Sequence, residues 1–543
     1  MPRALPLRAA LSLVLAAACA SRPAPPEPSA APSRAPALVV VVVIDQLASW
    51  ALEHYLPALD PAGALRRGIE RGAFHRRVVY PFAGTYTAAG HTSIFTGTAP
   101  SEHGVFANQR WDAAAGRDRR ILDDRTHEVF GVADLYASPT AIRVDTLADA
   151  LERATDGRAR IVAVSHKDRA VIPGAGRTAD LALWYEIARP GFTTSRYYAA
   201  APPDWLAAWE RKHPLEHVLA PWTPGDAALL AQLADADDAP GEGDWHGLGT
   251  VFPHEPARSS APYTTLRATP AATEHLLALA EEAAAEAGLG TDAVPDLLVV
   301  SVSTLDYAAH AFGPHSWEYV DNLIRADVAL GAFLARLEAR GEVAVLITSD
   351  HGGPPLPERT PGSGGRYDPD ELVRALDAAV AAELGPGPWI AAYAPPYVYC
   401  SEAARQSEHR ARVVELALAR LARMPGVGAA FEAREAAGWT EADDPVRRAA
   451  ALSSDPSLAG DIFVVPALGW MVDESPRGAG TSHGSPWPYD VEVPVVFWGP
   501  GVTRVDSAEP IDQRHVAATI AALLGVAPPP TARAGALPGS PAR

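Results

Sequence analysis

Short runs of apolar, mostly β-branched residues, each bounded by turn-forming residues, constrain the fold of this chain more than any other feature. The runs are continuous rather than alternating in polarity, which is typical of strands that are buried on both faces of a mostly parallel sheet. Stretches rich in Ala, Leu, Glu and Arg lie between them and predict helices. The predicted strands are residues 38–44, 161–164, 297–302, 343–348 and 495–498. The predicted helices are residues 273–287, 319–340, 369–384 and 404–423.

The alternation of strands and helices predicts an α/β fold, with a mostly parallel central sheet flanked by helices. We expect residues 38–527 to form this main domain. Two stretches within it, 111–295 and 354–466, are less regular and are interrupted more often by Pro, so we expect an inserted cap lobe roughly within them. Residues 528–543 are expected to form a disordered tail.

The N-terminus has the pattern of an export signal. Basic residues precede the apolar run 9–18, which is about half as long as a bilayer-spanning helix. We therefore predict a signal peptide at 1–18, and a Pro/Ala-rich linker at 19–37. A buried N-terminal helix is the alternative. These features predict an exported protein without a transmembrane helix, in the periplasm or on the outer surface of a bacterium.

The signal ends in Ala16-Ala17-Ala18-Cys19, which is similar to a bacterial lipobox. Cys19 could therefore carry a lipid anchor, and the protein would then be a lipoprotein. Ordinary signal-peptidase cleavage is the alternative. The only other cysteine is Cys400, and neither cysteine has the spacing of a zinc ligand, which excludes a thiolate zinc site.

The charge balance argues against one class of partner. The chain carries 65 acidic and 46 basic residues, a formal net charge of −19, and has no Lys/Arg cluster that could follow a phosphate backbone. Nucleic acid is therefore not expected as a bulk partner. Small phosphate esters remain possible substrates, because a single site can be locally positive. The oligomeric state is left open.

Carboxylates come shortly after three of the predicted strands. Asp45 ends the first run, Asp306 comes after the third, and Asp350 with His351 comes after the fourth. In open α/β sheets, ligands bind beyond the carboxyl ends of the strands. Three carboxylates gathered there would repel one another unless cations lay between them. This pattern therefore predicts a metal cluster.

Histidines at suitable spacing accompany these carboxylates. Asp306 and His310 would share one face of a helix, and two glycines after His351 would allow a sharp turn. A third histidine, His483, lies in a Gly-Thr-Ser-His-Gly loop. Taken singly, each of these has an ordinary structural explanation. Imidazole and carboxylate ligands without thiolates suit zinc better than magnesium, and manganese stays open.

A Gly/Ala/Thr-rich segment, residues 85–98, could supply a nucleophile. Thr87 would stand at the start of a helix, where free backbone N–H groups and the helix dipole attract a phosphate. An ordinary helix-capping role for Thr87 is the alternative. By composition alone, Thr85 and Thr92 compete with it.

Two blocks resemble one known family. Residues 85–104, TYTAAGHTSIFTGTAPSEHG, and residues 165–173, SHKDRAVIP, are similar to segments of the alkaline phosphatase superfamily. The resemblance is specifically to bacterial alkaline phosphatases with a threonine nucleophile, which are related to the type I phosphodiesterases and nucleotide pyrophosphatases. It extends from about residue 38 to residue 526.

The resemblance implies roles for particular residues. Thr87 would attack phosphorus, Asn108 would bind a phosphoryl oxygen, and Lys167 and Arg169 would grip the transferred group. It also implies two Zn²⁺ ions. Asp306, His310 and His483 would hold one ion, and Asp45, Asp350 and His351 would hold the other together with the Thr87 oxygen.

The implied activity is that of an exported two-zinc phosphate monoesterase with a phosphothreonine intermediate, acting on small phosphate monoesters. The positive charges of Lys167 and Arg169 would neutralise the additional negative oxygen of a monoester. A phosphodiesterase or nucleotide pyrophosphatase of the same superfamily is the alternative, and such enzymes generally have an apolar pocket in place of this pair. A binding protein without turnover and a sulfatase are weaker alternatives.

Overall fold

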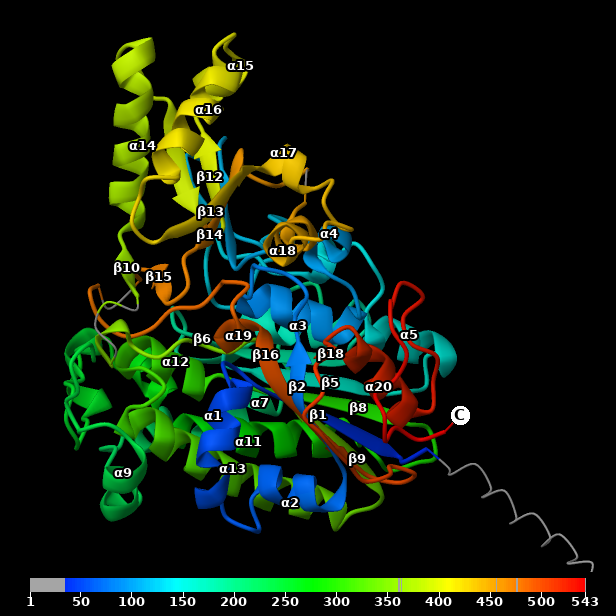
Figure 1. Ribbon diagram of the computed structural model, residues 1–543. Helices are drawn as coiled ribbons and strands as arrows, with labels where there is room; N and C mark the ends of the chain where they lie inside the picture. Colours follow the sequence, from blue (N-terminus) through cyan, green and yellow to red (C-terminus); the bar gives the residue numbers. More distant parts are fainter. Residues whose placement is uncertain (1–34, 360–361, 363, 456, 475–476, 543) are drawn as a thin grey trace, which may run out of the picture.

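A large mixed sheet forms the centre of the protein (Figure 1). The structure is a computed structural model, and it describes residues 35–359, 362, 364–455, 457–474 and 477–542. Five strands run parallel to one another: β1 (Leu38–Ile44), β5 (Ile161–Ser165), β6 (Leu181–Glu186), β8 (Asp296–Val302) and β9 (Val343–Thr348). The others at its edges are β2 (Ala73–Val79), β7 (Gly191–Thr193), β16 (Glu492–Trp498), β17 (Val505–Ser507) and β18 (Ile511–Asp512). The order is β17-β2-β16-β9-β1-β8-β5-β6-β7, with β18 beside β2.

Strand β1 shows why the runs are continuously apolar. Val39, Val41 and Val43 belong to the core on one face of the sheet, whereas the intervening residues belong to the core on the other. Because side chains alternate across a strand, a strand covered on both sides has no polar position. The first face is covered by α3 (Thr87–Thr96), α5 (Leu147–Ala154), α6 (Asp168–Ala175) and α20 (His515–Leu524). The second is covered by α1 (Ser49–Tyr55), α2 (Ala64–Arg71), α11 (Pro270–Glu286) and α13 (Trp317–Glu338).

A smaller lobe stands beside the sheet, at the top of Figure 1, and has its own core. Its sheet has the order β11-β12-β14-β13. The lobe comprises β11 (Ile390–Ala394), β12 (Tyr397–Cys400), β13 (Val427–Glu432), β14 (Ile462–Pro466), α14 (Pro369–Leu384), α15 (Glu402–Gln406) and α16 (Arg410–Leu421). The α/β fold with a mostly parallel sheet is therefore confirmed. The elements of this lobe lie within the stretch 354–466.

Three expectations differ from the structure. Most of the stretch 111–295 is not a lobe, since it supplies β5, β6, β7 and α11 to the main sheet and its cover. The predicted helix 404–423 is two helices, because Ser407 is extended and its Oγ accepts a bond from the His409 N–H. The tail, 528–543, is not frayed over its described part. Leu537 is buried and donates its N–H to Thr519 Oγ1 at 2.9 Å.

The predicted signal peptide and Cys19 lie outside the described residues, as does most of the linker. Over the described ranges, no helix combines the length and the apolarity that a bilayer crossing requires.

Helix α13 contains a buried carboxyl group that bears on stability. Asp327 accepts a bond from the Leu65 N–H at 2.7 Å, while its Oδ2 atom has no partner. Burial raises the pKa of Asp327 from 3.8 to about 7. The folded protein therefore keeps a proton that the unfolded chain loses as the pH rises from about 4, and stability falls until about pH 7.

We expect Asp327→Asn to remove this loss. The free energy of unfolding near pH 8 should rise by roughly 2 to 4 kcal/mol, and near pH 4 it should stay close to that of the wild type. Urea unfolding at the two pH values measures both quantities. An equal shift at both would contradict the assigned titration.

Candidate active site

The predicted ligands come together where neighbouring strands end. Asp45 directly follows β1, and Asp350 and His351 follow β9. Asp306 and His310 lie in α12 (Thr304–Phe312), which begins after β8. Because β8, β1 and β9 are adjacent and parallel, their carboxyl ends share one edge of the sheet. The sheet order therefore gathers residues that are far apart in the sequence.

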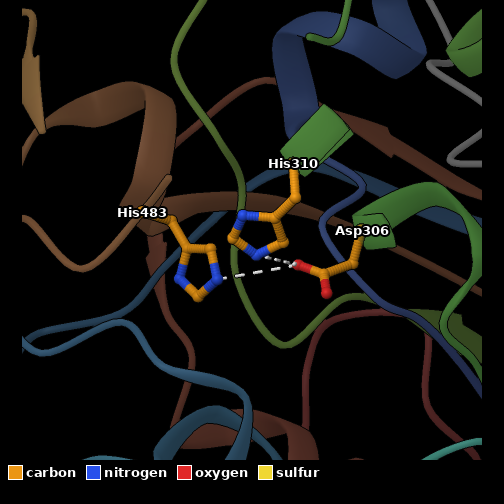
Figure 2. Close-up of side chains that lie close together, drawn as sticks. All are labelled: Asp306, His310 and His483. Atoms are coloured by element: carbon orange, nitrogen blue, oxygen red, sulfur yellow. Dashed lines mark ion pairs between the residues drawn. The ribbon is translucent and has the colours of Figure 1, made fainter. Parts of the chain in front are cut away.

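One ligand set consists of Asp306, His310 and His483, whose ligand atoms all lie within 4.8 Å of one another. Figure 2 shows both imidazole rings turned toward the carboxylate of Asp306. The Nε2 atom of His310 lies 3.3 Å from Asp306 Oδ1, and that of His483 lies 3.6 Å from the same oxygen. A turn of helix and a distant loop thus converge on one point.

Backbone carbonyl groups fix how these histidines present their nitrogen atoms. His310 Nδ1 donates to Thr481 O at 2.8 Å, and His483 Nδ1 donates to Thr85 O at 2.7 Å. A neutral imidazole that donates from Nδ1 keeps its lone pair on Nε2. Histidine ligands of metals commonly make such a second bond, which orients the ring.

The other set consists of Asp45, Asp350 and His351, also within 4.8 Å. His351 Nε2 lies 3.4 Å from Asp45 Oδ1 and 3.5 Å from Asp350 Oδ2. Its Nδ1 atom donates to Gly352 O at 2.9 Å. The same arrangement of one donated bond and one free nitrogen therefore recurs at both sets.

The chemistry of the donor atoms fits divalent metal ions. Asp45, Asp306 and Asp350 are at most 2% exposed, and each has one carboxylate oxygen without a hydrogen-bond partner. His351 Nε2 is also buried without such a partner. A buried polar atom left unpaired is costly, so these atoms need a cation. Two carboxylate and histidine sets without thiolates therefore suit a metal-dependent enzyme.

A buried ammonium group lies between the two sets. Lys167 Nζ is 2.6 Å from Asp45 Oδ2 and 2.5 Å from Asp306 Oδ2. Burial raises the pKa of Asp45 to about 6, and the carboxylates of Asp306 and Asp350 act in the same direction, whereas Lys167 opposes them. Burial and the two neighbouring carboxylates thus disfavour the ionised form of Asp45 unless cations compensate them.

The predicted nucleophile is the first residue of α3. Thr87 is not a helix cap, because the N-cap position is occupied by Tyr86. The Thr87 Oγ1 atom is buried without a hydrogen-bond partner, whereas Thr85 Oγ1 donates to Ser485 O and Thr92 Oγ1 donates to Ala88 O. Of the three competing threonines, Thr87 alone therefore has an uncommitted hydroxyl group.

Thr87 lines a cavity of about 590 Å³ together with Asn108, Arg169 and the first ligand set. Asn108 Oδ1 accepts a bond from the Ala88 N–H at 3.0 Å, which leaves its amide nitrogen as a donor. The Nε atom of Arg169 is buried without a hydrogen-bond partner. The cavity thus presents a hydroxyl group, a neutral donor and a guanidinium group beside the ligand set. Its outer wall comes partly from the lobe, including Asp370 and Tyr393.

No sequence pattern indicated a role for His91, which is fully buried in α3. His91 Nδ1 lies 2.9 Å from Thr87 O, to which it donates, and 3.0 Å from Asp350 Oδ2, while Nε2 lies 2.9 Å from Ser301 Oγ. The residue therefore links the helix of the nucleophile to a ligand of the second set. His91 is four residues after Thr87, a spacing that places both residues on one face of a helix and could have indicated this contact.

Arg120, at the end of β4 (Arg117–Arg120), was also missed. It lines the cavity, and its Nη1 atom is 2.7 Å from Asp168 Oδ2, beside Arg169. No spacing in the sequence connects it to the 165–173 block.

These features suit a phosphoester hydrolase. A sequence profile of the family described as type I phosphodiesterase / nucleotide pyrophosphatase matches residues 39–486, so the chain belongs to this family. The resemblance to the alkaline phosphatase superfamily, threonine-nucleophile type, is thereby confirmed.

Individual relatives agree with this assignment. The chain is 27% identical over 508 residues to alkaline phosphatase PhoV of Synechococcus elongatus, covering 91% of each chain. It is 29% identical to alkaline phosphatase PhoK of a Sphingomonas species, over 90% of this chain and 88% of the relative. The crystal structure of wild-type alkaline phosphatase PafA superposes with a TM-score of 0.85 at 26% identity, covering 94% of this chain and 99% of that one. The protein is thus a phosphatase of this superfamily.

Proposed function

We propose that the protein is an exported phosphate monoesterase that uses two zinc ions and forms a phosphothreonine intermediate at Thr87. The observation that supports this most is that a buried, unpartnered hydroxyl group shares one cavity with a metal-ligand set and Arg169. We place the enzyme in the periplasm or on the outer surface of a bacterium, with Cys19 as the point of a lipid anchor.

In the proposed reaction, Thr87 Oγ gives up its proton and attacks phosphorus, and the bond to the leaving oxygen breaks. The leaving group departs as an alcohol after taking up a proton. Water then attacks the phosphothreonine, which releases inorganic phosphate and restores the Thr87 hydroxyl group. Metal ions held by the two sets would supply Lewis-acid stabilisation of the attacking and leaving oxygens.

The chain's own donors have distinct tasks in this reaction. The Arg169 guanidinium and Lys167 ammonium groups stabilise charge on the phosphoryl oxygens, and Asn108 contributes one neutral hydrogen bond. The backbone N–H groups at the start of α3 favour the same negative charge.

A monoester is favoured over a diester by these cations, because a monoester has one more negative oxygen to neutralise. The outer walls carry charged side chains such as Arg120 and Glu474 beside apolar ones such as Leu122 and Val472, so the preference rests on the cations. The proposed enzyme therefore hydrolyses p-nitrophenyl phosphate faster than bis(p-nitrophenyl) phosphate, and the opposite order would favour the phosphodiesterase alternative.

We expect Arg169→Met to change this preference. Loss of the guanidinium group should lower kcat/KM for the monoester by on the order of 100-fold, because a preorganised charged donor is lost, and should lower that for the diester far less. Steady-state kinetics with both substrates measures the ratio.

Arg153→Met is the matched control, since Arg153 pairs with Asp145 outside the cavity and is about half exposed. This variant should leave both rates unchanged. Equal losses for the two substrates in Arg169→Met would argue against a role in monoester selection.

A further inference from the structure

Arg366 contacts the loop that carries a metal ligand, although it belongs to neither ligand set and does not line the cavity. It lies in β10 (Gly365–Tyr367), which pairs with β15 (Trp470–Val472). Its Nη2 and Nε atoms donate to Gly480 O at 2.6 and 3.2 Å. Glu358 holds the guanidinium group at 2.5 and 3.1 Å. The Arg366 side chain is only 9% exposed and that of Glu358 is 32% exposed, so the bonds to Gly480 O are better shielded from solvent than a surface ion pair would be.

The loop fits closely against the last turn of α12. Gly480 has a φ of +64°, and a Cβ atom there would lie 1.8 Å from His310 O. The next residue, Thr481, makes two hydrogen bonds to that turn: its N–H donates to Ala309 O, and its carbonyl oxygen accepts from His310 Nδ1. The peptide that Arg366 holds is therefore next to the group that orients His310.

The same loop also contacts the segment that follows His351 and the start of the nucleophile's segment. Thr481 Oγ1 donates to Pro354 O at 2.9 Å, three residues after His351. Two residues after Thr481, His483 bonds to Thr85 O. A shift of the Gly480–Thr481 peptide would thus displace His483 and would free the His310 ring to turn.

We infer that Arg366, held by Glu358, is a positioning residue that fixes the loop of His483 and so maintains the affinity of the Asp306, His310 and His483 set for its metal ion. The inference rests on the metal site of the proposed function. It goes beyond the proposed function because it makes the metal affinity of this set depend on an ion pair that contacts none of the three ligand side chains. Residues that orient metal ligands typically change affinity by 10- to 100-fold when they are removed.

A neighbouring ion pair provides a matched comparison. Arg359 binds Asp235 with two bonds, at 2.5 and 2.9 Å, and the hydrogen bonds described for its guanidinium group reach no carbonyl group of the metal loop. Arg359→Met therefore removes a bidentate ion pair from the same region without releasing Gly480.

The test measures zinc binding to the metal-free full chain, and competition with a chromophoric chelator reports the affinity of each equivalent. We expect Arg366→Met to weaken one of two zinc equivalents by about 10- to 100-fold and Arg366→Lys to lie between it and the wild type, because lysine can still donate one bond to Gly480 O. Arg359→Met should bind zinc as the wild type does. Denaturant unfolding of the metal-free proteins should show similar midpoints for the two methionine variants.

Wild-type affinity at both equivalents in Arg366→Met would overturn the inference. So would an equal loss in Arg366→Met and Arg359→Met, since this would indicate a general stabilising role. If Arg366→Met does not fold, the comparison of Arg366→Lys with Arg359→Met decides in the same way. Failure of the wild type to bind two zinc ions would contradict the proposed metal site itself.

Discussion

Replacing Thr87 with alanine is expected to lower kcat/KM for a phosphate monoester by on the order of 10³-fold or more. The Thr87 hydroxyl group is buried and has no hydrogen-bond partner, so its removal leaves no unsatisfied group and should not disturb the fold. The effect should fall on the chemical step, because the covalent route through threonine is lost. Steady-state kinetics and thermal unfolding of the same sample separate activity from stability.

Two further variants sharpen this prediction. Thr87→Ser keeps a hydroxyl group and should retain far more activity than Thr87→Ala. Thr92 lies on the same helix, but its hydroxyl group already donates to a backbone carbonyl. Thr92→Ala should therefore have a much smaller effect on turnover. Phosphate release by Thr87→Ala at the wild-type rate would exclude Thr87 as the nucleophile.

Replacing His351 with alanine should have the second large effect, a loss of activity on the order of 10³-fold together with a loss of bound metal. His351 is fully buried, and its free Nε2 atom lies between Asp45 and Asp350. Without it, the second set keeps two carboxylates and no imidazole, which favours zinc much less. Elemental analysis of purified protein should show the metal content falling from two ions toward one.

The control for this variant is His275→Ala. His275 is partly buried and bonds only the carbonyl of His213 among its described hydrogen bonds, and it belongs to neither ligand set. Its replacement should change neither metal content nor turnover. Unchanged metal content in His351→Ala would remove this residue from the proposed ligands.

The sequence predicted the centre of the sheet better than its edge. Buried parallel strands such as β1 and β9 are continuous apolar runs, and so they stand out from their surroundings. Strand β2 was missed because it contains Arg76 and Arg77, whose charges pair with Asp506 and Glu492 near the edge of the sheet. Only the tertiary arrangement brings these acidic partners beside the strand.

The candidate site was predictable where residues are local to one motif or follow a strand. Asp306 and His310 are one helical turn apart, and Asp45 directly follows β1. The bond from Arg366 to Gly480 spans 114 positions and is made to a backbone carbonyl group, which no residue type reveals. Contacts of this kind depend on how the lobe packs against the main domain, and the sequence carries no local signal for them.

The most direct test of the central claim is mass spectrometry of the enzyme after acid quenching during turnover of a phosphate monoester. We expect the peptide containing Thr87 to carry one added phosphoryl group, and fragmentation to place that group on Thr87. The same experiment on Thr87→Ala should show no such peptide. A phosphoryl group trapped on another residue would contradict the account. So would the absence of phosphorylated Thr87 in wild-type enzyme that is quenched while it turns over saturating monoester.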